Sequence, residues 1–233
     1  MKNFFYIVRH KKNKRLVTAK VTEMNISFVD IIDYVGTFAF ATSGIRLASK
    51  KNFDLFGALI VGFVTAVGGG TLRDVMLGKT PFWFTQNSYI IITLFSLVFF
   101  IIFNKYISKI GTTLFLFDTI GIGLFTVVGF HKSVECGCTL WVSTIMAMFT
   151  GAAGGVIRDI LLNEVPLIFR RDIYALACWF GGLVYLIGIK LNIPELITQI
   201  ACATTVITIR ICAVTYHWRM FVLRGHPRPA IAK

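Results

Sequence analysis

The feature that most constrains the fold is an internal repeat, in which residues of the first half recur 85 positions later without a gap (118 − 33 = 85). The repeated residues include Gly, Arg, Asp and Pro, which a shared apolar bias alone does not supply. Identical pairs include Asp33 and Asp118, Gly69 and Gly154, Gly70 and Gly155, Arg73 and Arg158, Asp74 and Asp159, Pro81 and Pro166, and Tyr89 and Tyr174. The pattern predicts two halves built from one structural unit.

Seven apolar stretches run through the chain, near 27–46, 55–78, 87–104, 113–130, 139–162, 173–190 and 195–214. The mean hydropathy is +0.74. Only 15% of the residues are charged, whereas a soluble domain carries about 25%. This composition excludes a disordered chain, a coiled coil and an ordinary soluble enzyme. It predicts an all-α polytopic membrane protein with seven transmembrane helices.

Each repeat contains three of these stretches. Because three is odd, the second repeat enters the membrane from the opposite side, which predicts an inverted duplication about a pseudo-twofold axis in the membrane plane. The seventh stretch has no partner. We expect a basic leader over 1–23, a first repeat over 24–109, a second over 110–193, a seventh helix over 194–216 and a basic tail over 217–233.

The second and fifth stretches carry glycine clusters near their ends. The predicted pore and gate glycines are Gly68, Gly69, Gly70, Gly151, Gly154 and Gly155. Small residues recur at every fourth position, which places them on one helix face where another backbone can approach. Glycine also weakens a helix, so we expect both helices to be kinked or broken at the clusters.

An Arg-Asp pair follows each glycine cluster, Arg73-Asp74 in the first repeat and Arg158-Asp159 in the second. Adjacent helical residues point about 100° apart, so we expect neither arginine to pair with the aspartate beside it. Asp33 is the expected partner of Arg73, and Asp118 is the expected partner of Arg158. Two interpretations remain open: charged constrictions of a symmetric pathway, or interfacial anchors and structural ion pairs.

Hydroxyl groups on the same helices are weaker candidates for lining a pathway. They are Thr65, Thr71, Ser143, Thr144 and Thr150. The alternative is that each bonds its own helix.

We find no metal-ligand spacing, cofactor motif, nucleotide-binding loop or catalytic arrangement, so we expect no enzyme and no metal or cofactor. The net charge of +13 comes from basic residues between and beyond the apolar stretches, which favours lipid over nucleic acid as the partner.

The segments GTFAFATSG, GGGTLRDVMLGKTPFW and GGVIRDILLNEVPLIF resemble the bacterial and archaeal trimeric intracellular cation (TRIC) channel homologues. Their domain is also described as a glycine transporter domain. The resemblance covers roughly residues 25–218. It implies a homotrimer with a pore in each protomer, lined by the kinked second and fifth helices, and passive, potassium-permeable conduction of monovalent cations (K⁺ or Na⁺). Transport of a small zwitterion such as glycine, or a structural role in the membrane, remains an alternative.

Basic residues also predict the orientation. With the leader included, the side on which the chain begins has 11 Lys and Arg residues and the opposite side has 13. Without residues 1–23, the numbers are 4 and 13. The second tally predicts an outside amino terminus and a cytoplasmic carboxyl terminus in a bacterial or archaeal plasma membrane. The resemblance implies the same orientation.

Overall fold

The computed structural model describes residues 27–109, 112–169 and 173–218. This part of the chain folds into seven α-helices and two short 3₁₀ helices, with no strands within it. The α-helices are α2 (Phe28–Lys50), α3 (Leu55–Met76), α4 (Ser88–Lys109), α5 (Thr113–Glu135), α6 (Leu140–Leu161), α7 (Ala175–Lys190) and α8 (Glu195–Thr215). The 3₁₀ helices are η1 (Phe82–Phe84) and η2 (Leu167–Phe169). The basic leader 1–23 and most of the tail 217–233 lie outside the described residues.

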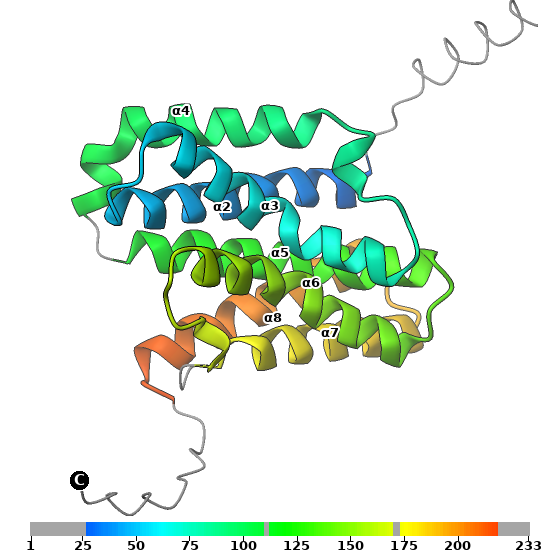
Figure 1. Ribbon diagram of the computed structural model, residues 1–233. Coiled ribbons are helices and arrows are strands. Elements are labelled where there is room, and N and C mark those ends of the chain that lie inside the picture. The colour runs from blue at the N-terminus through cyan, green and yellow to red at the C-terminus, as the bar shows by residue number, and fades with distance from the viewer. Residues whose placement is uncertain (1–26, 110–111, 170–172, 219–233) are drawn as a thin grey trace, which may run out of the picture.

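Two three-helix repeats and one additional helix make up the bundle, as the sequence predicts. In Figure 1, α2, α3 and α4 form one half, while α5, α6, α7 and α8 form the other. Successive helices cross the bundle in alternating directions. We call the end at which α2 begins the N-side and the end at which α8 finishes the C-side. Helix α5, the counterpart of α2, begins at the C-side, so the second repeat is inverted.

Reciprocal contacts show the pseudo-twofold axis. A Cβ atom placed on Gly36 would lie 2.9 Å from the Phe125 ring, and one on Gly121 would collide with the Phe40 ring. These are equivalent pairs, because Gly36 maps to Gly121 and Phe40 to Phe125 (121 − 36 = 85). The two rings meet edge to face with centroids 5.0 Å apart. Residues that contact their own equivalents in exchanged roles lie close to a twofold axis.

The turns repeat as well as the helices. Gly78 after α3 and its equivalent Asn163 after α6 both have positive φ, at 68° and 52°. Asn52 after α2 and its equivalent Gly137 after α5 also do, at 59° and 80°. Glycine and asparagine adopt this left-handed conformation most readily, and it closes the carboxyl end of a helix. The duplication therefore preserves backbone geometry where the residue type changes.

Six of the helices are long and apolar enough to cross a bilayer, and α7 is a shorter apolar helix of 16 residues. Large hydrophobic side chains cover the outside of the bundle, among them Phe56, Ile91, Phe95, Ile102 and Trp141, each at least 60% exposed. A surface of this kind suits lipid, where no polar group can be left unpaired. The chain is an integral membrane protein.

The interior has a different character from the surface. The three largest fully buried side chains are arginines: Arg46, Arg158 and Arg210, each 1% exposed. Burying a charge is costly unless it is paired and hydrogen-bonded. The interior of the bundle is therefore the place to look for a functional site.

Candidate functional site

Helices α3 and α6 cross at the predicted glycines. A Cβ atom on Gly69 would overlap the carbonyl oxygen of Thr150, and one on Gly154 would lie 2.5 Å from the carbonyl oxygen of Thr65. Because Thr65 maps to Thr150, this contact is reciprocal and lies close to the pseudo-twofold axis. Any side chain at these two positions would push the helices apart.

The remaining glycines face other neighbours. A Cβ atom on Gly68 would meet the end of the Ile157 side chain at 2.9 Å, and one on Gly151 would lie 3.2 Å from the Ile122 carbonyl oxygen of α5. Gly70 faces the Phe82 ring of η1, and Gly155 faces Tyr174. Neither helix is broken at its glycines, because α3 and α6 continue through them without interruption; the kink stays a prediction. These glycines permit close packing rather than interrupting the helix.

The two Arg-Asp pairs correct a second expectation, since each arginine binds the aspartate beside it. Arg73 Nε and Nη2 donate to Asp74 Oδ1 at 2.9 and 2.7 Å. Arg158 Nε and Nη2 contact Asp159 Oδ1, both at 2.9 Å. The 100° separation did not prevent pairing, because the long arginine side chain can curve around the last turn of the helix.

Each aspartate also ties the end of its helix to the following 3₁₀ helix. Asp74 Oδ2 accepts the backbone N–H of Phe82 at 2.9 Å, and Asp159 Oδ2 accepts that of Leu167 at 3.1 Å. Phe82 and Leu167 are equivalent positions in the two repeats. The Arg-Asp motif therefore has a structural role, which agrees with the interpretation of these residues as structural ion pairs.

Asp33 does not form the expected ion pair with Arg73. Its carboxylate accepts a hydrogen bond from the Tyr89 hydroxyl at 2.8 Å. The guanidinium of Arg73 instead binds Asp74 and lies 5.7 Å from the centroid of the Phe82 ring. Both carboxylates are buried, with Asp33 6% and Asp74 7% exposed. The sequence showed that Tyr89 is repeated, but it did not indicate Tyr89 as the partner of Asp33.

The second repeat does form the expected pair and extends it into a network. Arg158 Nη1 binds Asp118 Oδ1 at 2.6 Å and also donates to the Ser43 hydroxyl. Arg210 of α8 approaches the other carboxylate oxygen, Asp118 Oδ2, at 3.4 Å. The sequence analysis did not select Arg210 or Ser43. The sequence did contain a signal for Arg210, because it is a charged residue inside the last apolar stretch. Charges at membrane depth are costly, so such a residue is expected to have a partner.

The candidate hydroxyl groups mostly bond their own helices. Thr65, Thr71, Thr144 and Thr150 each donate to the carbonyl oxygen four residues earlier, at 2.6 to 3.0 Å. The Thr71 hydroxyl also accepts the Trp83 indole N–H at 3.0 Å. Ser143 is buried, and its hydroxyl has no partner among the described residues. These threonines, except Thr71, are nearly fully buried, so they add polarity to the interior near the α3–α6 crossing.

Each side of the bundle carries a cavity. The C-side cavity has a volume of about 270 Å³ and reaches Arg158 and Asp159, with Lys50, Lys51 and Glu164 also in its lining. Lys51 and Glu164 form an ion pair at 2.6 Å. The C-side cavity therefore extends to the edge of the ion-pair network, while Arg158 itself stays 1% exposed.

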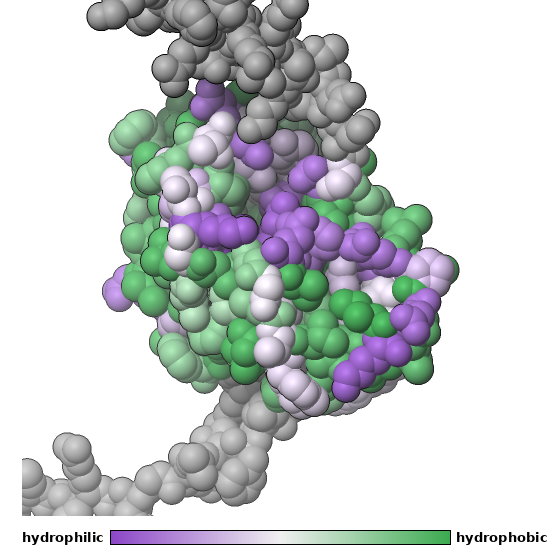
Figure 2. Space-filling model, turned by 90° about the vertical axis from the view of Figure 1, so that its right-hand side faces the viewer, coloured by the Kyte–Doolittle hydropathy of each residue, from purple (hydrophilic) through white to green (hydrophobic). Residues whose placement is uncertain are grey.

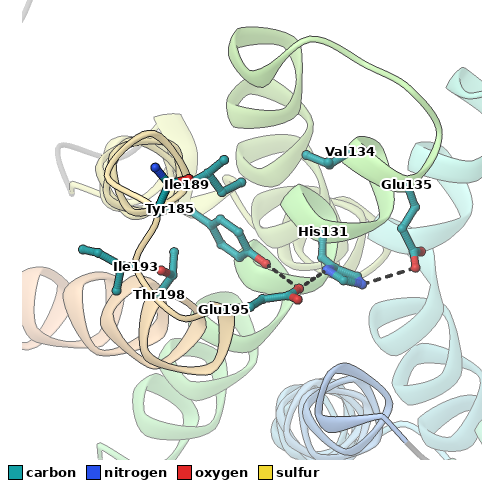
Figure 3. Close-up of a pocket in the computed structure, with 9 residues that line it drawn as sticks. His131, Val134, Glu135, Tyr185, Ile189, Ile193, Glu195 and Thr198 are labelled. Atoms are coloured by element: carbon teal, nitrogen blue, oxygen red, sulfur yellow. Dashed lines mark hydrogen bonds and ion pairs between the residues drawn. The ribbon is translucent and has the colours of Figure 1, made fainter.

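The N-side cavity is larger, about 520 Å³, and lies between the ends of α5 and α7 and the beginning of α8. In Figure 3, Tyr185, Glu195, His131 and Glu135 form a chain of contacts along one wall. His131 Nδ1 lies 2.9 Å from Glu195 Oε1, and Nε2 lies 3.3 Å from Glu135 Oε1. This chain joins α8 to α5 at the N-side.

Hydrophilic residues form a band across the N-side, with hydrophobic residues around it (Figure 2). Lys79, Lys132, Glu135, Asn192 and Glu195 are exposed or half-buried at this end of the bundle. A hydrogen bond with Cys136 raises the pKa of Lys79, which keeps this exposed amine charged. Among the described residues, no group of three or more His, Cys, Asp and Glu side chains could hold a metal ion.

Comparison with known proteins now identifies the family. A family model described as "Glycine transporter" matches the chain twice, over residues 30–105 and 115–190. The two matches begin 85 residues apart (115 − 30 = 85), which is the offset of the internal repeat. The UPF0126 inner membrane protein YadS of Escherichia coli K12 is 32% identical over 192 residues, which cover 81% of this chain and 93% of that protein.

Solved structures of TRIC channels match the whole bundle. A TRIC cation channel chain is 35% identical to this chain, covers 87% of it and 100% of its own length, and has a TM-score of 0.77. The TRIC channel orthologue of Rhodobacter sphaeroides is 30% identical, covers 81% and 98% of the two chains, and has a TM-score of 0.78. The chain belongs to the prokaryotic TRIC channel homologue family. These similar structures are ion channels rather than enzymes, in agreement with the expectation that the chain is not an enzyme.

Proposed function

We propose that the protein conducts monovalent cations, K⁺ among them, through a pore in each protomer lined by α3 and α6. The observation that carries the proposal is a series of buried polar groups that runs the length of the four helices α2, α3, α5 and α6. Asp33, Arg73 and Asp74 lie at the N-side, Thr65 and Thr150 near the central crossing, and Asp118, Arg158 and Ser43 at the C-side. Charges at membrane depth usually face a cavity or a pathway.

In this proposal the path is closed at the C-side by Arg158. Arg158 is 1% exposed and binds Asp118, Asp159 and Ser43, which come from three different helices. Its guanidinium joins α2, α5 and α6 where a permeating cation would have to pass. A fixed positive charge also repels a cation electrostatically. Conduction therefore requires Arg158 to move away from Asp118.

We further propose that three copies assemble in the membrane, as the similar solved channels do by their description as trimeric. The apolar outer surface of the bundle would then be shared between lipid and neighbouring protomers. Without residues 1–23, the excess of basic residues at the C-side supports an orientation with that end in the cytoplasm and the N-side outside. The channels' names and this charge distribution support these proposals.

Transport of glycine is the second candidate function, and three observations favour it. The matching family model is described as a glycine transporter, and inverted repeats also occur in secondary transporters. Among the described residues, the carboxylate of Asp33 has a hydrogen bond from Tyr89 and no ion pair with an arginine, so it could accept the ammonium group of a zwitterion. A transporter would show saturable, slow uptake rather than rapid ion flow.

Current across a planar bilayer that holds the purified protein distinguishes the two functions. Under a K⁺ gradient, unitary current steps that reverse near the K⁺ equilibrium potential are expected for the channel. Replacing K⁺ by Na⁺ on one side then measures selectivity from the shift in reversal potential. Absence of current at both polarities, together with uptake of labelled glycine into liposomes that hold the same protein, would instead establish the transporter.

A further inference from the structure

Tyr89 and Tyr174 occupy equivalent positions in the two repeats (174 − 89 = 85), but their hydroxyl groups differ. The Tyr89 hydroxyl donates to the carboxylate of Asp33 at 2.8 Å. The Tyr174 side chain is buried, with 1% of it exposed, and its hydroxyl has no hydrogen-bond partner in the part of the chain that the structure describes. A buried hydroxyl without a partner is unfavourable and calls for an explanation.

The carboxylates that correspond to each other are also bound differently. In the first repeat, Arg73 binds Asp74, and Tyr89 binds Asp33. In the second repeat, Asp118 is bound by arginines, Arg158 at 2.6 Å and Arg210 at 3.4 Å. The Tyr174 hydroxyl therefore lacks the bond that its equivalent makes. The four repeated positions (Asp33 and Asp118, Arg73 and Arg158, Asp74 and Asp159, Tyr89 and Tyr174) are therefore hydrogen-bonded in two different ways within one molecule.

Tyr174 already lies beside the carboxylate that it does not bind. A Cβ atom on Gly155 would overlap the Tyr174 hydroxyl and would lie 3.4 Å from Asp118 Oδ1. Both groups therefore border the same small space, which the absent side chain of Gly155 leaves free. A modest movement of either group would bring hydroxyl and carboxylate within hydrogen-bond distance.

We infer that the two repeats display two states of one switch, and that Tyr174 is the partner of Asp118 in the open state. In membrane proteins with inverted repeats, one repeat can rock or gate against the other. Because the two repeats have equivalent backbones and identical motifs, the arrangement seen in one repeat is geometrically available to the other. In the exchanged state Arg158 leaves Asp118 and keeps its bond to Asp159, as Arg73 does with Asp74. The Tyr174 hydroxyl then donates to Asp118, as Tyr89 does to Asp33.

Two contacts that have no equivalent around Arg73 and Asp33 hold the second repeat in its closed state. Arg210 belongs to α8, which has no counterpart in the duplication, and its guanidinium lies 4.7 Å from the centroid of the Tyr174 ring. Ser43 accepts a hydrogen bond from Arg158, whereas its equivalent position in the second repeat is Val128. These contacts explain why identical motifs adopt different arrangements, and why the closed gate lies at the C-side.

The inference rests on the proposed channel function, and Tyr174→Phe tests it in liposome K⁺ flux and single-channel recording. The substitution removes a hydrogen bond to a charged group from the open state alone, so open probability should fall about tenfold or more. The unfolding temperature should not fall, because the closed state makes no bond through this hydroxyl. Open probability equal to that of the unmodified protein would overturn the inference.

Two other tyrosines provide matched controls. Tyr89→Phe removes a hydroxyl that does bond a carboxylate, so this variant should unfold at a lower temperature than Tyr174→Phe. Tyr216→Phe alters a side chain that is 69% exposed at the end of α8, and it should leave both flux and unfolding unchanged. If Tyr174→Phe lowers the unfolding temperature as much as Tyr89→Phe does, the hydroxyl already has a partner and the inference is wrong.

A crystal structure of the Arg210→Gln variant tests the switch without reference to flux. Removing one of the two cations that bind Asp118 should let the Tyr174 hydroxyl approach this carboxylate to about 2.7 Å. A hydroxyl that stays without a partner would overturn the inference whatever the channel activity. If the bond forms while the unmodified protein passes no cations, the switch stands and the proposed function fails.

Discussion

Substituting two adjacent glycines of α3 by alanine tests how closely α3 and α6 must pack. A Cβ atom on Gly69 meets backbone atoms of α6, the Thr150 carbonyl oxygen and, at 3.3 Å, the Gly154 nitrogen. A Cβ atom on Gly68 meets the terminal methyl of Ile157 at 2.9 Å, which can rotate away. The two positions share a helix and a residue type but differ in what a new methyl group would displace.

The expected magnitudes follow from two opposing terms. Replacing glycine by alanine inside a helix stabilises it by about 1 kcal/mol. Overpacking costs about 1–3 kcal/mol, and the upper end applies to Gly69 because two helix backbones must separate. We therefore expect Gly69→Ala to lower the free energy of unfolding by about 2 kcal/mol. For Gly68→Ala the two terms nearly cancel, so a change near zero is expected.

The assay is reversible unfolding of the purified protein in mixed micelles by added sodium dodecyl sulfate, followed by tryptophan fluorescence. Gly154→Ala provides an internal check. Its Cβ atom would meet the Thr65 carbonyl oxygen at 2.5 Å, the reciprocal contact across the twofold axis, so it should behave like Gly69→Ala. Equal unfolding midpoints for Gly68→Ala and Gly69→Ala would refute the conclusion that these helices pack backbone to backbone.

Two further predictions concern the charges. Arg158→Gln leaves the buried carboxylate of Asp118 without its strongest partner and should lower the free energy of unfolding by about 3–5 kcal/mol. The double variant Arg158→Gln, Asp118→Asn should lose less free energy than the sum of the two single variants. A double-mutant cycle of unfolding free energies measures this difference. A protein that begins at Met24 should insert with its carboxyl terminus in the cytoplasm. A reporter enzyme that is active only in the cytoplasm should therefore be active when it is fused to this terminus. An inactive fusion in stably inserted protein would contradict the charge rule.

The fold could be predicted from the sequence because its two determinants are explicit in the residue pattern. Hydropathy located all seven helices, and the constant offset of 85 residues between the repeats predicted that the two three-helix units are inverted relative to each other. The ends were less certain: α4 continues to Lys109 and α5 to Glu135, beyond the apolar stretches. The last turns of these helices carry polar and charged residues near the membrane surface, where hydropathy no longer indicates a helix.

The candidate site could be predicted only in part. The glycines and the Arg158–Asp118 pair follow from the repeat, because identical residues in both halves indicate a shared environment. The Tyr89 partner of Asp33 and the second arginine at Asp118 do not follow, because they depend on residues that the repeat does not supply or does not distinguish. Arg210 lies on the unpaired helix, and Tyr89 and Tyr174 are identical in sequence yet bound differently. Identity between repeats indicates which groups interact, but not which of two arrangements each repeat adopts.

Symmetric backbones with asymmetric charges explain how a duplicated protein closes at one end only. The charged cluster of the N-side holds one arginine and two aspartates, Arg73 with Asp33 and Asp74, which gives a formal charge of 1 − 2 = −1. The C-side cluster holds Arg46, Arg158 and Arg210 with Asp118 and Asp159, or 3 − 2 = +1. A cation that enters from the N-side is attracted by the first cluster and repelled by the second. This difference supports the proposal of a barrier at the C-side, where α8, which has no counterpart in the duplication, contributes Arg210.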